Sequence, residues 1–237
     1  MAQEKHIPTD AIRKNSSEYA MMASVARYRL MDAVTKTFCE KHKGCNLVYL
    51  GAGLETAYNR LRESDAMFYQ VDLPEVIAAR RAILGAHDNE VLIGGDMFDL
   101  AWAQCVDKTS PTLIIVSGVF QYFTEPQVTG FIAQIRGLFP KCELVFDAAN
   151  EDGIQYANRY VKKTGNTNAV MHFYVDNGAA FASRTGTALI EEDPFFTDAR
   201  KLLSGKLKLY TRFAMRVVDK RKRAIVVHLG LHKETLQ

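Results

Sequence analysis

Short apolar runs alternate with amphipathic stretches through the middle of this chain, and this alternation constrains the fold more than any other feature. The apolar runs, rich in β-branched residues, predict strands at residues 46–50, 67–71, 90–93, 112–117 and 142–147. The stretches between them predict helices at residues 54–64, 75–86, 98–107 and 125–138. Strands that alternate with helices form βαβ units, whose strands pair in parallel through right-handed crossovers. Such short apolar strands are typical of a sheet that is covered on both faces.

The two ends of the chain follow other patterns. Residues 16–40 carry apolar side chains at helical spacing, after a first helix that Thr9 or Asp10 would cap. Beyond residue 147 the sequence predicts a helix at 150–164, an aromatic strand or pocket wall at 170–175, a strand at 187–191, and an amphipathic helix at 206–220. A final strand at 223–229 follows that helix directly, which permits an antiparallel last strand. We expect one domain over residues 1–237, with a helical lid at 1–42.

Composition excludes several classes of function. The 237 residues carry a formal net charge of only +3, which argues against a dedicated nucleic-acid binder. No run approaches the length of apolar residues that a membrane span needs, and the first residues lack the apolar core of a signal peptide. The four cysteines form no C-x-x-C pair and are expected to be free thiols. We therefore expect a cytoplasmic protein with no nucleic-acid or membrane partner.

No metal is expected either. Asp147 lies near Glu151 and Asp152 at the end of the fifth predicted strand, where some enzymes hold a divalent ion. No histidine or further carboxylate is placed to complete such a site.

A pair of glycines, Gly51-x-Gly53, directly follows the strand at 46–50. Glycine lets the backbone turn sharply and approach a ligand closely, although a plain strand-to-helix turn also uses it. The dinucleotide fingerprint requires a third glycine, and Thr56 occupies that position. No Gly-Lys-Ser/Thr follows, so a P-loop is absent. The pattern therefore disfavours NAD, which remains an alternative.

Two further features follow the next two predicted strands. Asp72 ends the strand at 67–71, where a carboxylate can accept hydrogen bonds from both ribose hydroxyls. The segment Gly94–Phe98 follows the third strand, and its Asp96 can accept a hydrogen bond from the amine of adenine. Ligands of open α/β sheets bind at the carboxyl ends of the strands. Three such features at three successive strand ends favour S-adenosylmethionine, a nucleoside cofactor without phosphates.

The same residues resemble the leucine carboxyl methyltransferase family, which includes the tetracenomycin-type polyketide O-methyltransferases. The resemblance covers about residues 45–150 and is carried by segments 47–56, 68–77, 95–96, 116–123 and 144–147. Its most specific part is Asp72-Leu-Pro-Glu-Val-Ile77. Upstream, Arg27 lies five residues before Asp32, as an arginine does in the helix that this family places over the cofactor.

The resemblance implies a Rossmann-like α/β fold of the class I methyltransferase type, with a seven-stranded sheet and an antiparallel last strand. It also implies S-adenosylmethionine as methyl donor and S-adenosylhomocysteine as product. Arg27 would pair with the methionyl carboxylate, Asp72 would bind the ribose, and Asp96 with Met97 would bind the adenine. The residues expected to bind the cofactor are Arg27, Gly51, Ala52, Gly53, Asp72, Leu73, Asp96, Met97 and Ser117. Ser117 stands where the family has a glutamate.

The methyl acceptor is expected to bind near residues 150–205. His172 lies in an aromatic segment and is a candidate base or acceptor ligand, although a core histidine fits the same pattern. Tyr122 follows the fourth strand, where cofactor and acceptor would meet. The leading hypothesis is an O-methyltransferase that acts in line on a hydroxyl or carboxylate of a small molecule, in secondary metabolism. The alternatives are a protein carboxyl methyltransferase, an NAD-dependent oxidoreductase, and a non-catalytic relative that binds the cofactor only, which Ser117 keeps open.

Overall fold

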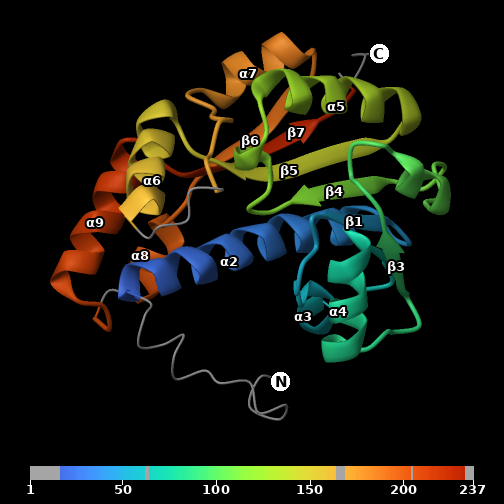
Figure 1. The fold of residues 1–237 in the computed structure, drawn as a ribbon, viewed down its shortest axis with the longest axis horizontal. Coiled ribbons are helices and arrows are strands. Elements are labelled where there is room, and N and C mark those ends of the chain that lie inside the picture. The colour runs from blue at the N-terminus through green and yellow to red at the C-terminus, as the bar shows by residue number, and fades with distance from the viewer. Residues whose placement is uncertain (1–16, 62–63, 164–168, 204, 233–237) are drawn as a thin grey trace.

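A seven-stranded sheet forms the centre of the protein, with strand order β3-β2-β1-β4-β5-β7-β6 (Figure 1). The computed structural model describes residues 17–61, 64–163, 169–203 and 205–232. The strands are β1 (Asn46–Leu50), β2 (Met67–Asp72), β3 (Glu90–Gly94), β4 (Thr112–Val116), β5 (Cys142–Ala148), β6 (Ala188–Pro194) and β7 (Ile225–Gly230). Strands β1 to β5 pair in parallel, and β7 is antiparallel to both β5 and β6. The predicted sheet with an antiparallel last strand is therefore confirmed.

Helices cover both faces of this sheet. They are α2 (Glu18–Lys41), α3 (Ala57–Leu61), α4 (Pro74–Leu84), α5 (Glu125–Leu138), α6 (Glu151–Lys163), α7 (Gly178–Thr185), α8 (Thr197–Leu202) and α9 (Leu209–Lys220), with short 3-10 helices η1 (Ala101–Cys105) and η2 (Phe120–Tyr122). Figure 1 shows α5 and α7 on one side of the sheet and α2 with α3 on the other. None of the helices in these described ranges is long and apolar enough to cross a membrane.

Successive residues of the central strands point to opposite faces of the sheet and so pack into two separate hydrophobic cores. Val48 and Leu50 of β1 face the core that α5 and α7 cover, whereas Leu47 and Tyr49 face the core under α2. Every residue of β1 is buried because the strand lies in the middle of a sheet covered on both faces. This fixes the register of β1, since a slip by one residue would exchange the two faces.

The long helix α2 begins one residue after Ser17, whose side-chain oxygen accepts a hydrogen bond from the Ala20 N–H at 3.1 Å. Such a contact is the usual N-cap of a helix. The helix confirms the expected segment 16–40, and the proposed cap at Thr9 or Asp10 lies outside the described residues. Helix α2 packs across β4, β5 and β7 on one face of the sheet.

Several elements differ from those the sequence predicts. The expected helix at 98–107 is only the 3-10 helix η1, and Leu100 before it has a left-handed conformation with φ of 59°, which interrupts any helix from residue 98. The segment 170–175 forms no strand, and α7 and α8 were not predicted. Both helices lie between α6 and α9, so the region expected at the acceptor side is more helical than its pattern indicates.

Candidate functional site

The two glycines after β1 have left-handed backbone conformations, with φ of 66° at Gly51 and 48° at Gly53. The Gly51 and Ala52 N–H groups both donate to the Val71 carbonyl of β2, at 2.9 and 3.1 Å. A Cβ atom on Gly51 would overlap the Val119 side chain, whereas one on Gly53 would meet no atom within 4 Å. Gly51 is therefore required by packing, and Gly53 leaves open space in front of the turn.

Asp72 closes this turn from the end of β2. Its Oδ2 accepts a hydrogen bond from the Gly53 N–H at 2.7 Å, and its Oδ1 accepts one from the Leu73 N–H at 2.7 Å. Each carboxylate oxygen can accept two hydrogen bonds. Asp72 thus retains an acceptor position on each oxygen while the backbone holds the carboxylate in place. The Leu73 side chain beside it is 47% exposed.

The loop after β3 lies at the same edge of the sheet, because the Gly95 N–H donates to the Asp72 carbonyl at 2.9 Å. Asp96 is exposed, and its Oδ1 accepts a hydrogen bond from the Phe98 N–H at 2.9 Å. Met97 is only 7% exposed and packs in the core under α5. Its side chain therefore offers little surface to a ligand, whereas the Asp96 carboxylate remains accessible.

A cavity of about 230 Å³ lies between α2 and the glycine turn. It is lined by Arg27, Tyr28, Tyr49, Leu50, Gly51, Ala52, Gly53, Leu54, Glu55, Ile115 and Ser117. Five of the nine residues expected to bind a cofactor thus meet at one cavity. Three others lie at or just after the ends of the neighbouring strands β2 and β3, namely Asp72, Leu73 and Asp96. Burial raises the pKa of the Tyr49 phenol far above its ordinary value, so Tyr49 contributes no charge there.

Arg27 points from α2 towards the end of β5, where its Nε lies 3.2 Å from Oδ2 of Asp147. The other carboxylate oxygen of Asp147 accepts a hydrogen bond from the Gly118 N–H at 2.6 Å. Gly118 has φ of 74°, and a Cβ there would lie 2.8 Å from Arg27 Nη1. Sequence reasoning considered Asp147 only as a metal ligand and missed this pairing. No group of three or more metal-binding side chains occurs among the residues that the structure describes.

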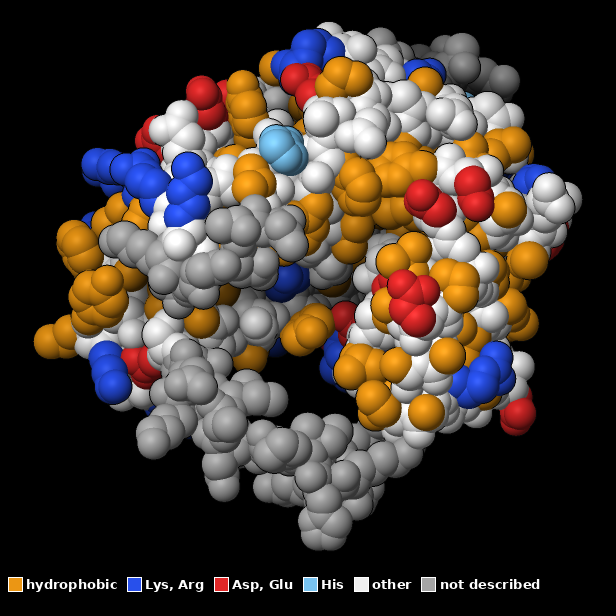
Figure 2. All heavy atoms as spheres, viewed as in Figure 1, with side chains coloured by type: hydrophobic (Ala, Val, Ile, Leu, Met, Phe, Trp, Pro, Cys, Tyr) orange, Lys and Arg blue, Asp and Glu red, His pale blue; other side chains and the backbone are white. Residues whose placement is uncertain are grey.

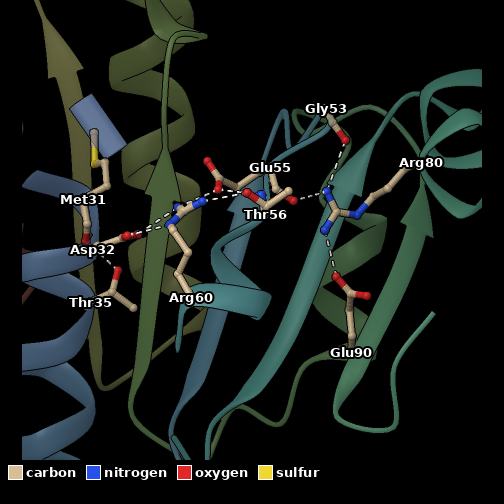
Figure 3. A network of polar contacts seen from close by, with 9 residues as sticks. All are labelled: Met31, Asp32, Thr35, Gly53, Glu55, Thr56, Arg60, Arg80 and Glu90. Atoms are coloured by element: carbon tan, nitrogen blue, oxygen red, sulfur yellow. Dashed lines mark hydrogen bonds and ion pairs between the residues drawn. The ribbon is translucent and has the colours of Figure 1, made fainter. Parts of the chain in front are cut away.

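Two arginines, Arg60 and the buried Arg80, contact the glycine turn and the loop after it (Figure 3). Arg60 of α3 contacts both carboxylate oxygens of Asp32 on α2, at 2.6 and 2.9 Å, and also Glu55 at 2.8 Å and Thr56 at 2.7 Å. Burial opposes the charge on Arg60, but the Asp32 and Glu55 carboxylates outweigh it and raise the pKa of the guanidinium. The contact joins α2 to the loop that lines the cavity.

Arg80 of α4 is the second of these arginines, and its side chain is only 2% exposed. It donates to the carbonyls of Gly53 and Glu55, at 3.2 and 2.7 Å, and to the Glu90 carboxylate at 2.8 Å. Figure 3 shows Arg80 between the turn on one side and Glu90 on the other. The arginine thus satisfies two loop carbonyls and balances a carboxylate that is equally buried.

The two candidate residues on the acceptor side lie close together in the backbone. The His172 and Phe173 N–H groups both donate to the Gln121 carbonyl, at 2.7 and 3.3 Å, and Gln121 precedes Tyr122. Phe173 is buried in the core, whereas His172 is exposed and Tyr122 is 44% exposed. The face of the molecule drawn in Figure 2 is hollowed near its centre, with hydrophobic side chains around the hollow.

A larger groove of about 1340 Å³ lies at the opposite edge of the sheet. Pro111 and Cys142, at the amino ends of β4 and β5, line it together with the second half of α2. None of the residues expected in a site lines this groove. Because ligands of open α/β sheets bind at the carboxyl ends of the strands, the smaller cavity is the better candidate.

Comparison of the sequence with known families and proteins finds two matches that agree. The leucine carboxyl methyltransferase family matches residues 1–136. The tetracenomycin polyketide synthesis O-methyltransferase TcmP of Streptomyces glaucescens is 23% identical over 203 residues, which cover 83% of this chain and 75% of TcmP. The family match spans β1 to β4, including the glycine turn and Asp72.

Solved structures of other methyltransferases share the fold. A putative methyltransferase of Haloferax volcanii, solved with the Trm112 methyltransferase activator, superposes with a TM-score of 0.58 and 16% identity over 92% of this chain and 99% of its own. The magnesium protoporphyrin IX methyltransferase ChlM of Synechocystis PCC 6803, solved with bound S-adenosylhomocysteine, superposes with a TM-score of 0.57 and 12% identity. The match covers 91% of this chain and 88% of ChlM. At such identities the likeness concerns the fold alone.

Proposed function

This chain belongs to the leucine carboxyl methyltransferase family, and from that premise we propose that it methylates a hydroxyl or carboxylate oxygen of a small molecule. Membership and fold make it a methyltransferase that uses S-adenosylmethionine. The alternative of an NAD-dependent oxidoreductase is thereby set aside. The O-methyltransferase TcmP, which shares 23% of aligned residues, supports oxygen as the acceptor atom.

The residues at the carboxyl ends of the parallel strands fit this cofactor. The observation that carries the proposal is the double role of Asp72, which holds the Gly53 N–H and keeps free acceptor positions for two ribose hydroxyls. The open space in front of Gly53 gives room for the methionyl group. We assign the methionyl carboxylate to Arg27 and the adenine amine to Asp96, with Gly51, Ala52, Leu73 and Ser117 beside them. Met97 would contribute mainly its backbone.

When bound, S-adenosylmethionine supplies a methyl group on a sulfonium, whose sulfur is a good leaving group. The protein's own contribution is chiefly to hold donor and acceptor in line, and orientation of this kind provides much of an enzyme's rate. A carboxylate acceptor is already ionised, whereas a hydroxyl acceptor is assisted by a base. His172, exposed and tied by its backbone beside Tyr122, is the proposed base for a hydroxyl.

Calorimetric titration with S-adenosylhomocysteine, with NAD as control, tests the cofactor assignment. We expect micromolar binding of the first and none of the second. Methyl transfer from radiolabelled S-adenosylmethionine to a panel of phenols, carboxylic acids and a peptide with a free carboxyl terminus then tests the acceptor. Labelling of the peptide alone would favour a protein carboxyl methyltransferase, the activity for which the matching family is named. Cofactor binding without labelling of any acceptor would favour a non-catalytic relative.

Replacing Asp72 by alanine is expected to weaken binding of S-adenosylhomocysteine by about 1–3 kcal/mol, because it removes charge-assisted hydrogen bonds to the ribose. Asp99→Ala is the matched control, since Asp99 is exposed and also accepts a backbone hydrogen bond, from the Ala101 N–H at 2.8 Å. Calorimetry of both variants gives the comparison. Equal affinities of the Asp72→Ala variant and the wild-type protein would contradict the ribose assignment.

Replacing His172 by alanine is expected to lower turnover of a hydroxyl acceptor by about 10²–10⁴-fold, the usual contribution of a general base. Affinity for S-adenosylhomocysteine should stay the same, because the cavity beside Arg27 does not include His172. His87→Ala is the control, since His87 stacks on Tyr58 at 4.1 Å on another part of the surface. Wild-type turnover in the His172→Ala variant would remove the histidine from the mechanism.

A further inference from the structure

We propose that Asp147 is a positioning residue, which orients Arg27 and thereby sets the affinity of the site for the amino-acid end of S-adenosylmethionine. The inference rests on the proposed function, because it takes Arg27 as the partner of the methionyl carboxylate. Asp147 comes from β5, beyond the residues that the family matches, and stands one residue after Phe146, which is level with Val116 of β4. It therefore lies beside Ser117, which lines the cavity, and Gly118, whose N–H donates to it.

The first argument is burial. The Asp147 side chain is only 8% exposed; one oxygen accepts a hydrogen bond from the Gly118 N–H, and the other forms an ion pair with Arg27 Nε at 3.2 Å that lacks hydrogen-bond geometry. A carboxylate removed from water in this way needs compensation by hydrogen bonds and an opposite charge. Because the Gly118 N–H is neutral, Arg27 is the cation that balances Asp147 among the residues that the structure describes. The two side chains thus constrain each other.

The second argument is the choice of nitrogen atom. Asp147 contacts Nε of Arg27, which leaves the four N–H groups on Nη1 and Nη2 for other acceptors. The guanidinium is planar and rigid, so an ion pair at Nε favours one direction of the whole group. Arg27 lines the cavity, and its Nη1 occupies space that any side chain at position 118 would fill. The glycine at 118 thus permits the orientation that Asp147 imposes.

The third argument is charge. The amino-acid end of the cofactor is a zwitterion, which carries an ammonium and a carboxylate. The Arg27–Asp147 pair presents one cation and one anion at this edge, whereas Ser117 is neutral there. Glu55, which also lines the cavity, is already bound to Arg60 at 2.8 Å. Asp147 is therefore the carboxylate that pairs with Arg27 at the amino-acid end of the cofactor. It lies in β5, whereas Ser117 follows β4.

The test compares two probes, S-adenosylhomocysteine and 5′-methylthioadenosine, which lacks the amino-acid end. Asp147→Asn is expected to weaken binding of the first by about 10- to 100-fold, within the range of coupling between residues in contact. Binding of the second should change by no more than about twofold, the scatter expected for an independent site. Asp152→Asn is the matched control, because Asp152 follows in α6 and its side chain is 67% exposed.

A double-variant cycle separates positioning from a general structural role. If Asp147 acts through Arg27, the Arg27→Ala, Asp147→Asn double variant loses no more affinity than Arg27→Ala alone. Unchanged binding of S-adenosylhomocysteine by Asp147→Asn, or equal weakening of both probes, would overturn the inference. If Asp147→Asn unfolds, Asp147→Glu keeps the charge but moves the carboxylate, and the same difference between probes is expected. Failure of the wild-type protein to bind either probe would instead refute the proposed function, on which the inference depends.

Discussion

Replacing Arg80 by methionine is expected to lower the free energy of unfolding by about 3–5 kcal/mol, the effect of breaking a buried ion pair on one side. The substitution leaves the Glu90 carboxylate, which is 2% exposed, without its cation. It also removes the donor to the carbonyls of Gly53 and Glu55 behind the glycine turn. Methionine fills similar space, so the loss is chiefly electrostatic rather than a cavity.

Urea denaturation of Arg80→Met and Arg81→Met measures this effect against a control in the same helix, because Arg81 is exposed. Arg81→Met should change the free energy of unfolding by less than about 0.5 kcal/mol, as surface substitutions usually do. Adding Glu90→Leu to Arg80→Met should recover much of the lost stability, since an apolar pair can replace a buried ion pair. If Arg80→Met lowers the free energy of unfolding no more than Arg81→Met does, the buried ion pair does not stabilise the fold as expected.

The two consequences of losing Arg80 are separable. Glu90→Leu restores the balance of buried charge, but it supplies no donor for the two loop carbonyls. We therefore expect the Arg80→Met, Glu90→Leu double variant to regain stability. Its affinity for S-adenosylhomocysteine should remain below that of the wild-type protein, as in Arg80→Met alone. Full recovery of affinity would mean that Arg80 does not support the glycine turn.

Replacing Gly51 by alanine is expected to cost about 2–5 kcal/mol of stability, of which 1–2 arise from the left-handed backbone and 1–3 from overpacking. The backbone contribution follows from the φ of 66° at this residue. The packing contribution follows from the overlap of the new Cβ with the Val119 side chain. Because valine is branched at Cβ and stiff, Val119 cannot easily turn away.

Gly44 provides a matched control, since its φ is 64° and a Cβ there would meet no atom within 4 Å. Gly44→Ala should show the backbone cost alone, about 1–2 kcal/mol. Adding Val119→Ala to Gly51→Ala relieves the overlap and should bring the cost towards that of Gly44→Ala. Thermal unfolding and urea denaturation measure these differences. Equal losses for Gly44→Ala and Gly51→Ala would show that close packing against Val119 is not a constraint.

The first five strands were predictable because their signals are local. The runs Asn46–Leu50 and Thr112–Val116 are almost wholly apolar and prove to be buried at every residue. The turn at Gly51 and the carboxylate at Asp72 could also be read from the chain, because each follows its strand directly. Parallel strands then bring the two together without further information.

Other features depend on contacts that no local pattern reveals. Arg27 and Asp147 come from an amino-terminal helix and the fifth strand, and their meeting follows only from how α2 crosses the sheet. The burial of Met97 depends likewise on the core under α5. A local signal for α7 did exist, since Asn177 caps its start and Gly186 ends it with φ of 67°. The helix α8 has six residues and no side-chain cap, so it leaves little trace in the sequence.

The course of α2 has a consequence for how the protein is made. Three residues of α2 contact residues that follow much later in the chain. Asp32 pairs with Arg60 and Arg27 pairs with Asp147. Glu18 accepts a hydrogen bond from the Thr211 hydroxyl, with an oxygen–oxygen distance of 2.6 Å. Synthesis produces α2 long before Asp147 and Thr211, and contacts of such separation slow folding. Until they emerge, the apolar face of α2 remains uncovered and open to association with other chains. Assembly of the cavity is thus a late event, and the exposed face of α2 needs protection from other chains until the later strands are made.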